Sequence, residues 1–243
     1  MGLTDLSNIK LYATKPHACS YLDDHEATTI FVDPEFGMTG EIYSELSEFG
    51  FRRSGSHVYR PKCQSCQACI PIRIPVGTFK PTRAQKRCLK RNSDLAIESL
   101  DSIDTDEHYT LYERYIAARH TDGDMYPANR NQYRDFLTSE WGITRYIEYR
   151  LQGQLIGVAV ADVLESGVSA IYTFFDPELS KRSLGVFNIL FHIQWAHELN
   201  LPYVYLGYWI KKCQKMNYKV DYRPFQVLIQ NSWITVSDFS GQI

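Results

Sequence analysis

The stretch from Arg60 to Asn92 constrains this 243-residue chain more than any other, because three patterns follow one another in it. It begins with three cysteines, each three residues after the last, over 63–69. Isoleucines then alternate with other residues over 70–74, as in a β-strand. The stretch ends in a basic run over 83–91 that contains no Asp or Glu. These patterns predict a cysteine loop, a strand and a basic helix in that order.

The basic run places five cations on one face of a helix: Arg83, Lys86, Arg87, Lys90 and Arg91. Like charges at this spacing destabilise a helix by about 0.2–0.5 kcal/mol per pair unless an anion lies along them. A nucleic-acid backbone supplies such an anion, and we predict that this face contacts it. A solvated helix, balanced by carboxylates elsewhere in the chain, is the alternative.

Several sequence motifs resemble those of the aminoacyl-tRNA:protein transferases of the N-end rule. They are PHxCSYL (16–22), GFRRSGSHVYRP (50–61), CxxCxACIPxR (63–73), KRNxDL (90–95), RHxDGDM (119–125), YTFFDP (172–177), RSLG (182–185), LPYVYLGYWI (201–210) and KMxYK (215–219). Within that family the chain is similar to the bacterial leucyltransferase branch, which is homologous to the eukaryotic arginyltransferases. The matches run in order along nearly the whole chain.

The resemblance implies transfer of leucine from leucyl-tRNA to the α-amine of proteins that begin with Asp or Glu. The product would then pass to an adaptor and a protease. Arginyl transfer and coenzyme A-dependent N-acetyl transfer on the same fold are the alternatives. The net charge of −2 excludes a globally basic nucleic-acid binder, so tRNA contact must come from local charge asymmetry. We find no apolar stretch of spanning length and expect a cytoplasmic protein.

Periodicity and turn residues predict an α/β (α+β) fold with a sheet flanked by helices. The order of a hairpin, a third strand, a helix and a further strand over 144–207 resembles the acyltransferase fold of the N-acetyltransferase superfamily, which implies a mixed, acyltransferase-like sheet. The predicted helices cover 40–49, 83–91, 104–120, 131–140 and 186–199; the predicted strands cover 27–32, 57–60, 70–76, 95–100, 144–150, 155–163, 169–175 and 203–207. We expect strands 57–60 and 70–76 to pair across the cysteine loop. We expect one body of two lobes, an N-terminal lobe over 1–95 and a C-terminal acyltransferase-like lobe over 96–243.

A predicted strand-to-helix junction carries the first candidate site. Arg182, Ser183 and Gly185 precede or begin a helix, where free backbone N–H groups and the helix dipole favour an anion. The junction resembles the pyrophosphate loop of acetyltransferases, but Phe187 replaces a small residue there. This departure argues against coenzyme A and favours another anion, such as the terminal phosphates of tRNA. An ordinary capped helix is the alternative.

The RHxDGDM segment supplies an imidazole and two carboxylates, His120, Asp122 and Asp124. These groups can orient the α-ammonium of an acceptor and receive its proton, although Asp and Gly are also common in plain turns. We take Lys215 and Tyr218 of KMxYK as candidate substrate-binding residues.

Aromatic residues concentrate in two strands that we expect to be neighbours: Tyr172, Phe174, Phe175, Tyr203, Tyr205, Tyr208 and Trp209. Successive strand residues face opposite sides, so those on one side form the core. Those on the other side, with Tyr172 as the candidate for the reaction centre, can stack an adenosine or line a leucine pocket.

An acceptor beginning with Asp or Glu requires a cation for its side chain, because an unpaired buried carboxylate costs several kcal/mol. Arg73 is the first candidate, since it alternates with Ile72 and Ile74 on a strand and a guanidinium binds carboxylates through two donors. Arg52 and Arg53 are its rivals. A structural ion pair is the alternative for Arg73.

The cysteines Cys63, Cys66 and Cys69, with Cys19 as a fourth, are numerous enough for a zinc or iron–sulfur site. The eukaryotic relatives, however, have a CxxC pair where this chain has Cys19-Ser20-Tyr21-Leu22. We therefore prefer reduced structural thiols, expect no disulfide and place Cys88 and Cys213 in the core. No cofactor is required, since an aminoacyl ester is already activated.

Overall fold

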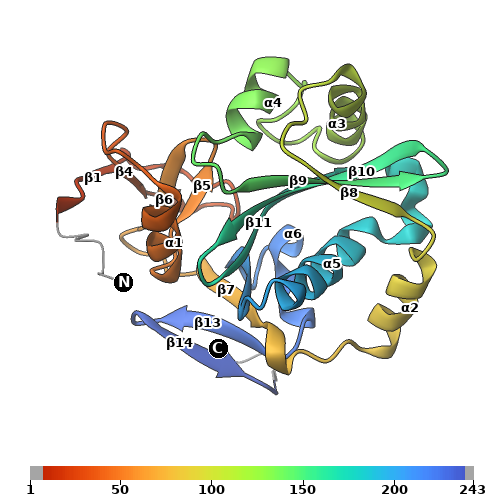
Figure 1. Ribbon diagram of the computed structural model, residues 1–243. Helices are drawn as coiled ribbons and strands as arrows, with labels where there is room; N and C mark the ends of the chain where they lie inside the picture. The colour runs from red at the N-terminus through yellow and green to blue at the C-terminus, as the bar shows by residue number, and fades with distance from the viewer. Residues whose placement is uncertain (1–7, 239–243) are drawn as a thin grey trace.

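One eight-stranded mixed sheet organises the chain in the computed structural model, which describes residues 8–238 (Figure 1). Across the sheet the strands lie in the order β14 (Ser232–Val236), β13 (Phe225–Ile229), β7 (Ile70–Pro75), β12 (Tyr203–Trp209), β11 (Gly167–Phe175), β10 (Gln154–Leu164), β9 (Thr144–Leu151) and β8 (Ala96–Leu100). Neighbours run antiparallel except β11 and β12, which are parallel. A parallel pair requires a crossover, and the helix α5 (Leu184–Glu198) supplies it.

Helices cover both faces of this sheet, as Figure 1 shows. On one face α5 packs on β11 and β12, and α2 (Arg83–Arg91) packs beside α5. On the other face α3 (Asp106–Arg119) packs on β10 and β11, next to α4 (Arg130–Leu137). Two apolar clusters result, one around Ile72, Ile74 and Leu190, and one around Tyr112 and Phe174. The mixed sheet between helices confirms the predicted fold class.

A smaller sheet stands at one end of the large one, in the order β1 (Leu11–Ala13), β4 (Thr29–Val32), β6 (His57–Pro61) and β5 (Arg52–Ser54). A short ladder, β2 (His17–Ala18) with β3 (Glu26–Ala27), and the helix α1 (Gly40–Glu48) accompany it. A fully buried ion pair joins the two sheets: Arg53 donates from Nε to Asp162 Oδ2 at 2.6 Å and from Nη2 to Oδ1 at 2.7 Å.

Short helical turns complete the chain: η2 (Val76–Thr78), η3 (Pro177–Arg182), α6 (Gln214–Asn217) and η4 (Tyr218–Asp221). No helix of the described residues is long and apolar enough to span a bilayer. All the helices and strands predicted from the sequence occur, and Thr39 and Thr82 cap α1 and α2 at their N-termini. The hairpin β13–β14 was not predicted.

One predicted pairing is wrong. β6 pairs with β4 and β5 in the small sheet, whereas β7 pairs with β12 and β13 in the large sheet. The cysteine loop between them is a crossing between sheets and not a hairpin turn. The physical reason lies in β7, whose residues 71–74 are buried, as in a strand with neighbours on both sides.

The predicted division near residue 95 does not separate two sheets. β7 and α2 precede that residue, yet β7 lies inside the large sheet and α2 packs on α5. The two segments of chain are therefore interleaved in one large sheet and its covering helices.

The fold predicts how stability depends on pH through His192 of α5, whose two ring nitrogens are buried without a partner among the described residues. Burial lowers its pKa from 6.5 to about 4. As pH falls, the unfolded chain therefore binds a proton at this histidine before the folded chain does. The free energy of unfolding is retained above pH 6.5 and falls by roughly 3 kcal/mol between pH 6.5 and 4 because of this residue. Urea unfolding should show His192→Leu losing less stability over this range than the wild type; an equal loss would contradict the assignment.

Candidate functional site

A cavity of about 1380 Å³ lies where the two parallel strands part. β11 and β12 pair at three positions, Gly167 with Tyr203 through Ser169 with Tyr205, and then diverge. Residues beyond the last pair line the cavity from both strands: 170–173 and Phe175 from β11, and 206–208 from β12. A bulge in β12, with Gly207 at φ +76°, accompanies the divergence. Parting of the strands thus opens the sheet to solvent next to the N-terminus of α5.

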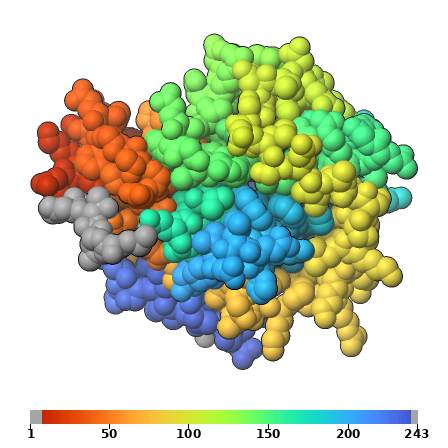
Figure 2. All heavy atoms as spheres, in the orientation of Figure 1, coloured from red at the N-terminus to blue at the C-terminus, as the bar shows by residue number. Residues whose placement is uncertain are grey.

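The lining of this cavity is strongly basic. Among the described residues that line it Asp221 is the one carboxylate, and the cations are Arg52, Arg53, Arg87, Arg91, Arg119, Lys215, Lys219 and Arg223. Arg87 and Arg91 come from α2, whose five predicted cations are all exposed and form no ion pair with a described carboxylate. Figure 2 shows the α2 segment along an outer edge of the molecule, at the lower right. An anionic ligand fits this lining.

Arg52 is a buried cation inside the cavity, 4% exposed. Its Nη1 donates to the carbonyl oxygens of Phe51 at 2.6 Å and Ser47 at 3.3 Å. Its Nε and Nη2 are buried and have no hydrogen-bond partner among the described residues. Neighbouring Arg53 also lines the cavity, but Asp162 already occupies its guanidinium. Of the two rivals, Arg52 is the one with free donors.

Lys219, which the sequence reasoning left out of the site, is a second buried cation in this cavity, 5% exposed. Its Nζ donates to the carbonyl oxygen of Tyr208 at 2.7 Å and lies 3.6 Å from the sulfur of Met216. Burial, and after it the charge of Arg52, lowers the pKa of Lys219 to about 7. The position of this lysine in the KMxYK segment was the signal available.

Arg73 does not belong to the site, contrary to the prediction. It is 5% exposed, its Nη1 donates to Glu48 Oε2 at 2.7 Å, and its Nε donates to Gln226 at 2.7 Å. The rings of Tyr203 and Trp233 enclose its guanidinium at 3.4 and 4.2 Å. Alternation on β7 correctly placed Arg73 opposite Ile72 and Ile74, but that face is covered by Glu48 of α1. The structural ion pair is its role.

The RHxDGDM segment lies at the rim of the cavity. His120 caps α3 and lines the cavity; burial, then the charges of Lys215 and Arg119, lowers the pKa of its imidazole although Asp122 opposes this. Asp122 accepts a hydrogen bond from Lys215 Nζ at 2.7 Å. Neither Asp122 nor Asp124 lines the cavity, so the three predicted groups do not converge there.

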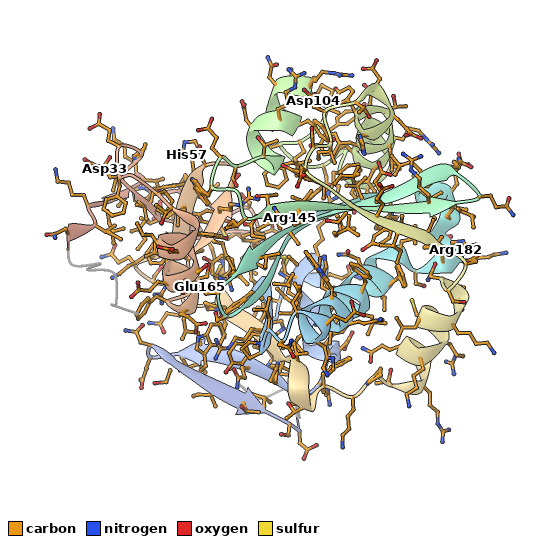
Figure 3. The ribbon with its side chains drawn as sticks, viewed as in Figure 1. Asp33, His57, Asp104, Arg145, Glu165 and Arg182 are labelled. Atoms are coloured by element: carbon orange, nitrogen blue, oxygen red, sulfur yellow. The ribbon has the colours of Figure 1, made fainter. Side chains whose placement is uncertain are left out.

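The predicted residues at the junction before α5 differ in whether they line the cavity. Arg182 pairs with both oxygens of Asp94 at 2.8 Å and does not line the cavity, which corrects its predicted anion-binding role. In Figure 3 it lies at the right-hand edge, above α2. Ser183, in the left-handed conformation, and Gly185 do line the cavity. The N-terminus of α5 therefore faces the ligand space without Arg182.

Aromatic side chains form the apolar part of the wall. The two aromatic strands are neighbours as predicted, and Tyr172, Tyr208 and Tyr218 line the cavity. The Tyr172 hydroxyl is buried without a partner among the described residues. Sequence reasoning missed Asn188, a polar residue in the apolar run over 184–191, which bridges Tyr149 and Thr173 at 2.7 Å each.

The Cys69 thiol lies near those of Cys63, Cys19, Cys66 and Cys213, and Cys213 lines the cavity. Burial, followed by the thiols of Cys63, Cys19, Cys66 and Cys213, raises the pKa of Cys69 to about 12. The described residues include no group of three His, Cys, Asp or Glu side chains placed to hold a metal ion. All six thiols are free; Cys88 is buried as predicted, whereas Cys213 lines the cavity and is not a core residue.

Two models of protein families match the chain. Residues 17–87 match the N terminus, and residues 107–229 the C terminus, of arginine-tRNA-protein transferase. The chain therefore belongs to the arginine-tRNA-protein transferase family.

Within this family, curated relatives named aspartate/glutamate leucyltransferase resemble the chain over nearly its whole length. The relative from Saccharophagus degradans is 58% identical, with 96% of this chain and 99% of that protein covered. The relative from Teredinibacter turnerae is 61% identical, with 96% and 97% covered. The relative from Stutzerimonas stutzeri is 53% identical, with 97% and 100% covered.

Two solved structures share part of the fold. The C-terminal domain of a putative lysylphosphatidylglycerol synthetase from Agrobacterium fabrum has a TM-score of 0.46 and 13% identity, with 70% of this chain and 52% of that chain covered. L-PGS from Bacillus licheniformis has a TM-score of 0.43 and 10% identity, with 68% and 50% covered. This chain spans about half of each, and a likeness this distant carries no argument.

The site predicts opposite roles for two buried arginines. Arg73→Met should lower the free energy of unfolding by about 2 kcal/mol or more, because it leaves Glu48 without its cation. Arg52→Met should leave stability unchanged or raise it, because it removes a buried charge that has no carboxylate partner. Thermal and urea unfolding of both variants measure this, and a larger loss in Arg52→Met than in Arg73→Met would reverse the assignment.

Proposed function

We propose that this protein transfers leucine from leucyl-tRNA to the α-amine of proteins beginning with Asp or Glu, and so marks them for degradation by a downstream adaptor and protease. Family membership, together with relatives of that name over the full length, carries this proposal. The basic cavity supports it, because both substrates bring negative charge. Charged tRNA and nascent proteins are available in the cytoplasm, where we place the activity.

The reaction forms an amide bond and breaks an ester bond. The acceptor α-amine attacks the leucyl carbonyl carbon, the 3′ oxygen of tRNA leaves, and the amine proton is taken up as the tRNA hydroxyl is restored. An α-amine with a pKa of about 7.7–8.0 is partly neutral at physiological pH, so positioning carries most of the acceleration. We propose that the reaction needs no cofactor.

The residues divide into four roles. α2 lies along the tRNA backbone, with Arg87 and Arg91 at the edge of the cavity. The aromatic wall around Tyr172 takes the leucyl-adenosine end. His120 lies at the rim, and its lowered pKa keeps a neutral imidazole available to accept the amine proton. Arg52, in place of Arg73, meets the acceptor carboxylate.

The experiment that tests the function offers purified protein three tRNAs charged with labelled Leu, Arg or Phe. Each is combined with peptides that begin with Asp, Glu, Lys or Ala, in a buffer with a chelator. Leucine should appear on the Asp and Glu peptides alone. Preferred transfer of Arg would assign the arginyl branch, and transfer that stops with chelator would contradict the cofactor-free reaction. Labelled acetyl coenzyme A serves as the acetyltransferase control.

The α2 face predicts salt-dependent tRNA binding. Lys86→Glu/Lys90→Glu changes two exposed cations outside the cavity and should raise the Kd for tRNA about tenfold or more. The slope of log K against log salt should fall by about one per lost phosphate contact. A matched control, Lys10→Glu/Lys62→Glu, changes two exposed cations outside α2 and outside the cavity lining. Equal Kd values and slopes for the two double variants would show that α2 is merely solvated.

A further inference from the structure

The cavity contains two buried cations for which the described residues provide no carboxylate. Arg52 is 4% exposed and has two unpaired donor nitrogens, and Lys219 is 5% exposed and donates to one carbonyl oxygen. The charge of Arg52 lowers the pKa of Lys219, although burial lowers it more. By contrast, Arg53 and Arg73, the other buried arginines, each have a carboxylate partner. Of the buried cations, the two without a carboxylate partner among the described residues both line the cavity.

Such an arrangement is costly in the absence of a ligand. Removing an ammonium or a guanidinium from water carries a penalty of several kcal/mol unless an anion compensates it. Two cations in the lining of one cavity also repel each other. An anion placed between them would remove both penalties, which indicates a receptor for one negatively charged group.

We propose that Arg52 and Lys219 together bind the side-chain carboxylate of the acceptor's first residue, and that Lys219 takes up a proton as this carboxylate enters. The inference rests on the proposed function and identifies the residues that select the acceptor. The phosphates of tRNA are met by the exposed cations of α2, outside this buried pair. Arg52 comes from β5 and Lys219 from η4, so the receptor joins two distant segments of the chain.

The groups around Lys219 explain why its amine takes up a proton when a carboxylate binds. The charged or titratable groups that face it are Arg52 from β5, Cys69 before β7, Cys213 before α6 and the Tyr218 ring at 6.0 Å. Arg52 and burial favour the neutral amine, whereas the two thiols exert a smaller opposite effect only when ionised. A bound carboxylate stabilises the ammonium and raises the pKa of Lys219. Acceptor binding therefore weakens as pH rises above about 7, where the free lysine is increasingly neutral.

A calorimetric titration without tRNA measures binding in the absence of transfer. Two peptides that differ only in a first residue of Asp or Asn are titrated into the full chain at pH 8, in two buffers of different ionisation enthalpy. The wild type should take up roughly half to one proton more with the Asp peptide than with the Asn peptide. The pKa of each peptide's α-amine is measured separately, because the side-chain carboxylate of Asp raises it relative to Asn, and its contribution to the proton uptake is subtracted.

Variants of Lys219 distinguish the effect of its positive charge from the effect of its proton uptake. Lys219→Met should raise the Kd of the Asp peptide about tenfold, change that of the Asn peptide less than twofold and abolish the extra proton uptake. Lys219→Arg stays charged, so it should bind the Asp peptide well without taking up the proton. Lys10→Met, an exposed lysine, is the matched control. Thermal unfolding verifies that each variant is folded.

Three outcomes would overturn the receptor: an unchanged Kd for the Asp peptide in Lys219→Met, equal weakening of both peptides, or loss of tRNA binding instead of peptide binding. These are distinct from a failure of the proposed function. If no leucine is transferred but the Asp peptide still binds with proton uptake, the receptor stands and the reaction is a different one. If leucine transfer proceeds with the same KM for Asp peptides in Lys219→Met, the receptor alone is wrong.

Discussion

The parting of two parallel strands determines the rest of this structure. β11 and β12 touch closely where Gly167 meets Tyr203: a Cβ at Gly167 would lie 2.3 Å from the Tyr203 carbonyl oxygen. Close contact at one end and a bulge at Gly207 on the other make the strands diverge. The gap exposes backbone and side chains that a continuous sheet would bury. α5, which must cross between the parallel strands, brings its N-terminus to this gap.

The charges of the protein fall into two groups with different consequences. Arg53 with Asp162 and Arg73 with Glu48 are buried and paired, and they fasten the small sheet and α1 to the large sheet. Burial alone raises the pKa of Glu48, but hydrogen bonds from Ser166 and Tyr205 and the charge of Arg73 lower it overall. These pairs hold the walls of the cavity. Arg52 and Lys219, which line the cavity, have no carboxylate partner among the described residues.

Local sequence patterns were sufficient to predict most of the helices and strands, but they were insufficient to predict the residues of the site. Alternation, caps and the basic run located the helices and strands, because these signals depend on residues close in sequence. The neighbours of β7 depend on contacts with residues 203–229, more than a hundred positions away, which no local signal carries. Alternation along β7 likewise predicted which face of the strand Arg73 occupies, but it could not predict that Glu48 of α1 covers that face. Arg52 and Lys219 could be distinguished from other basic residues only by their burial and their lack of a carboxylate.

The interleaving of the chain explains why the cavity needs both segments matched by the family models. Arg52 and α2 come from the residues before 95, whereas β11, β12 and Lys219 come from those after it. β7 links the two segments. The chain leaves the small sheet after β6, passes through the cysteine loop and enters the large sheet as β7, which pairs between β12 and β13. Its insertion brings the segment that carries Arg52 to one side of the parted strands and α2 to the other. The two basic surfaces of the site are therefore held in place by the same strand.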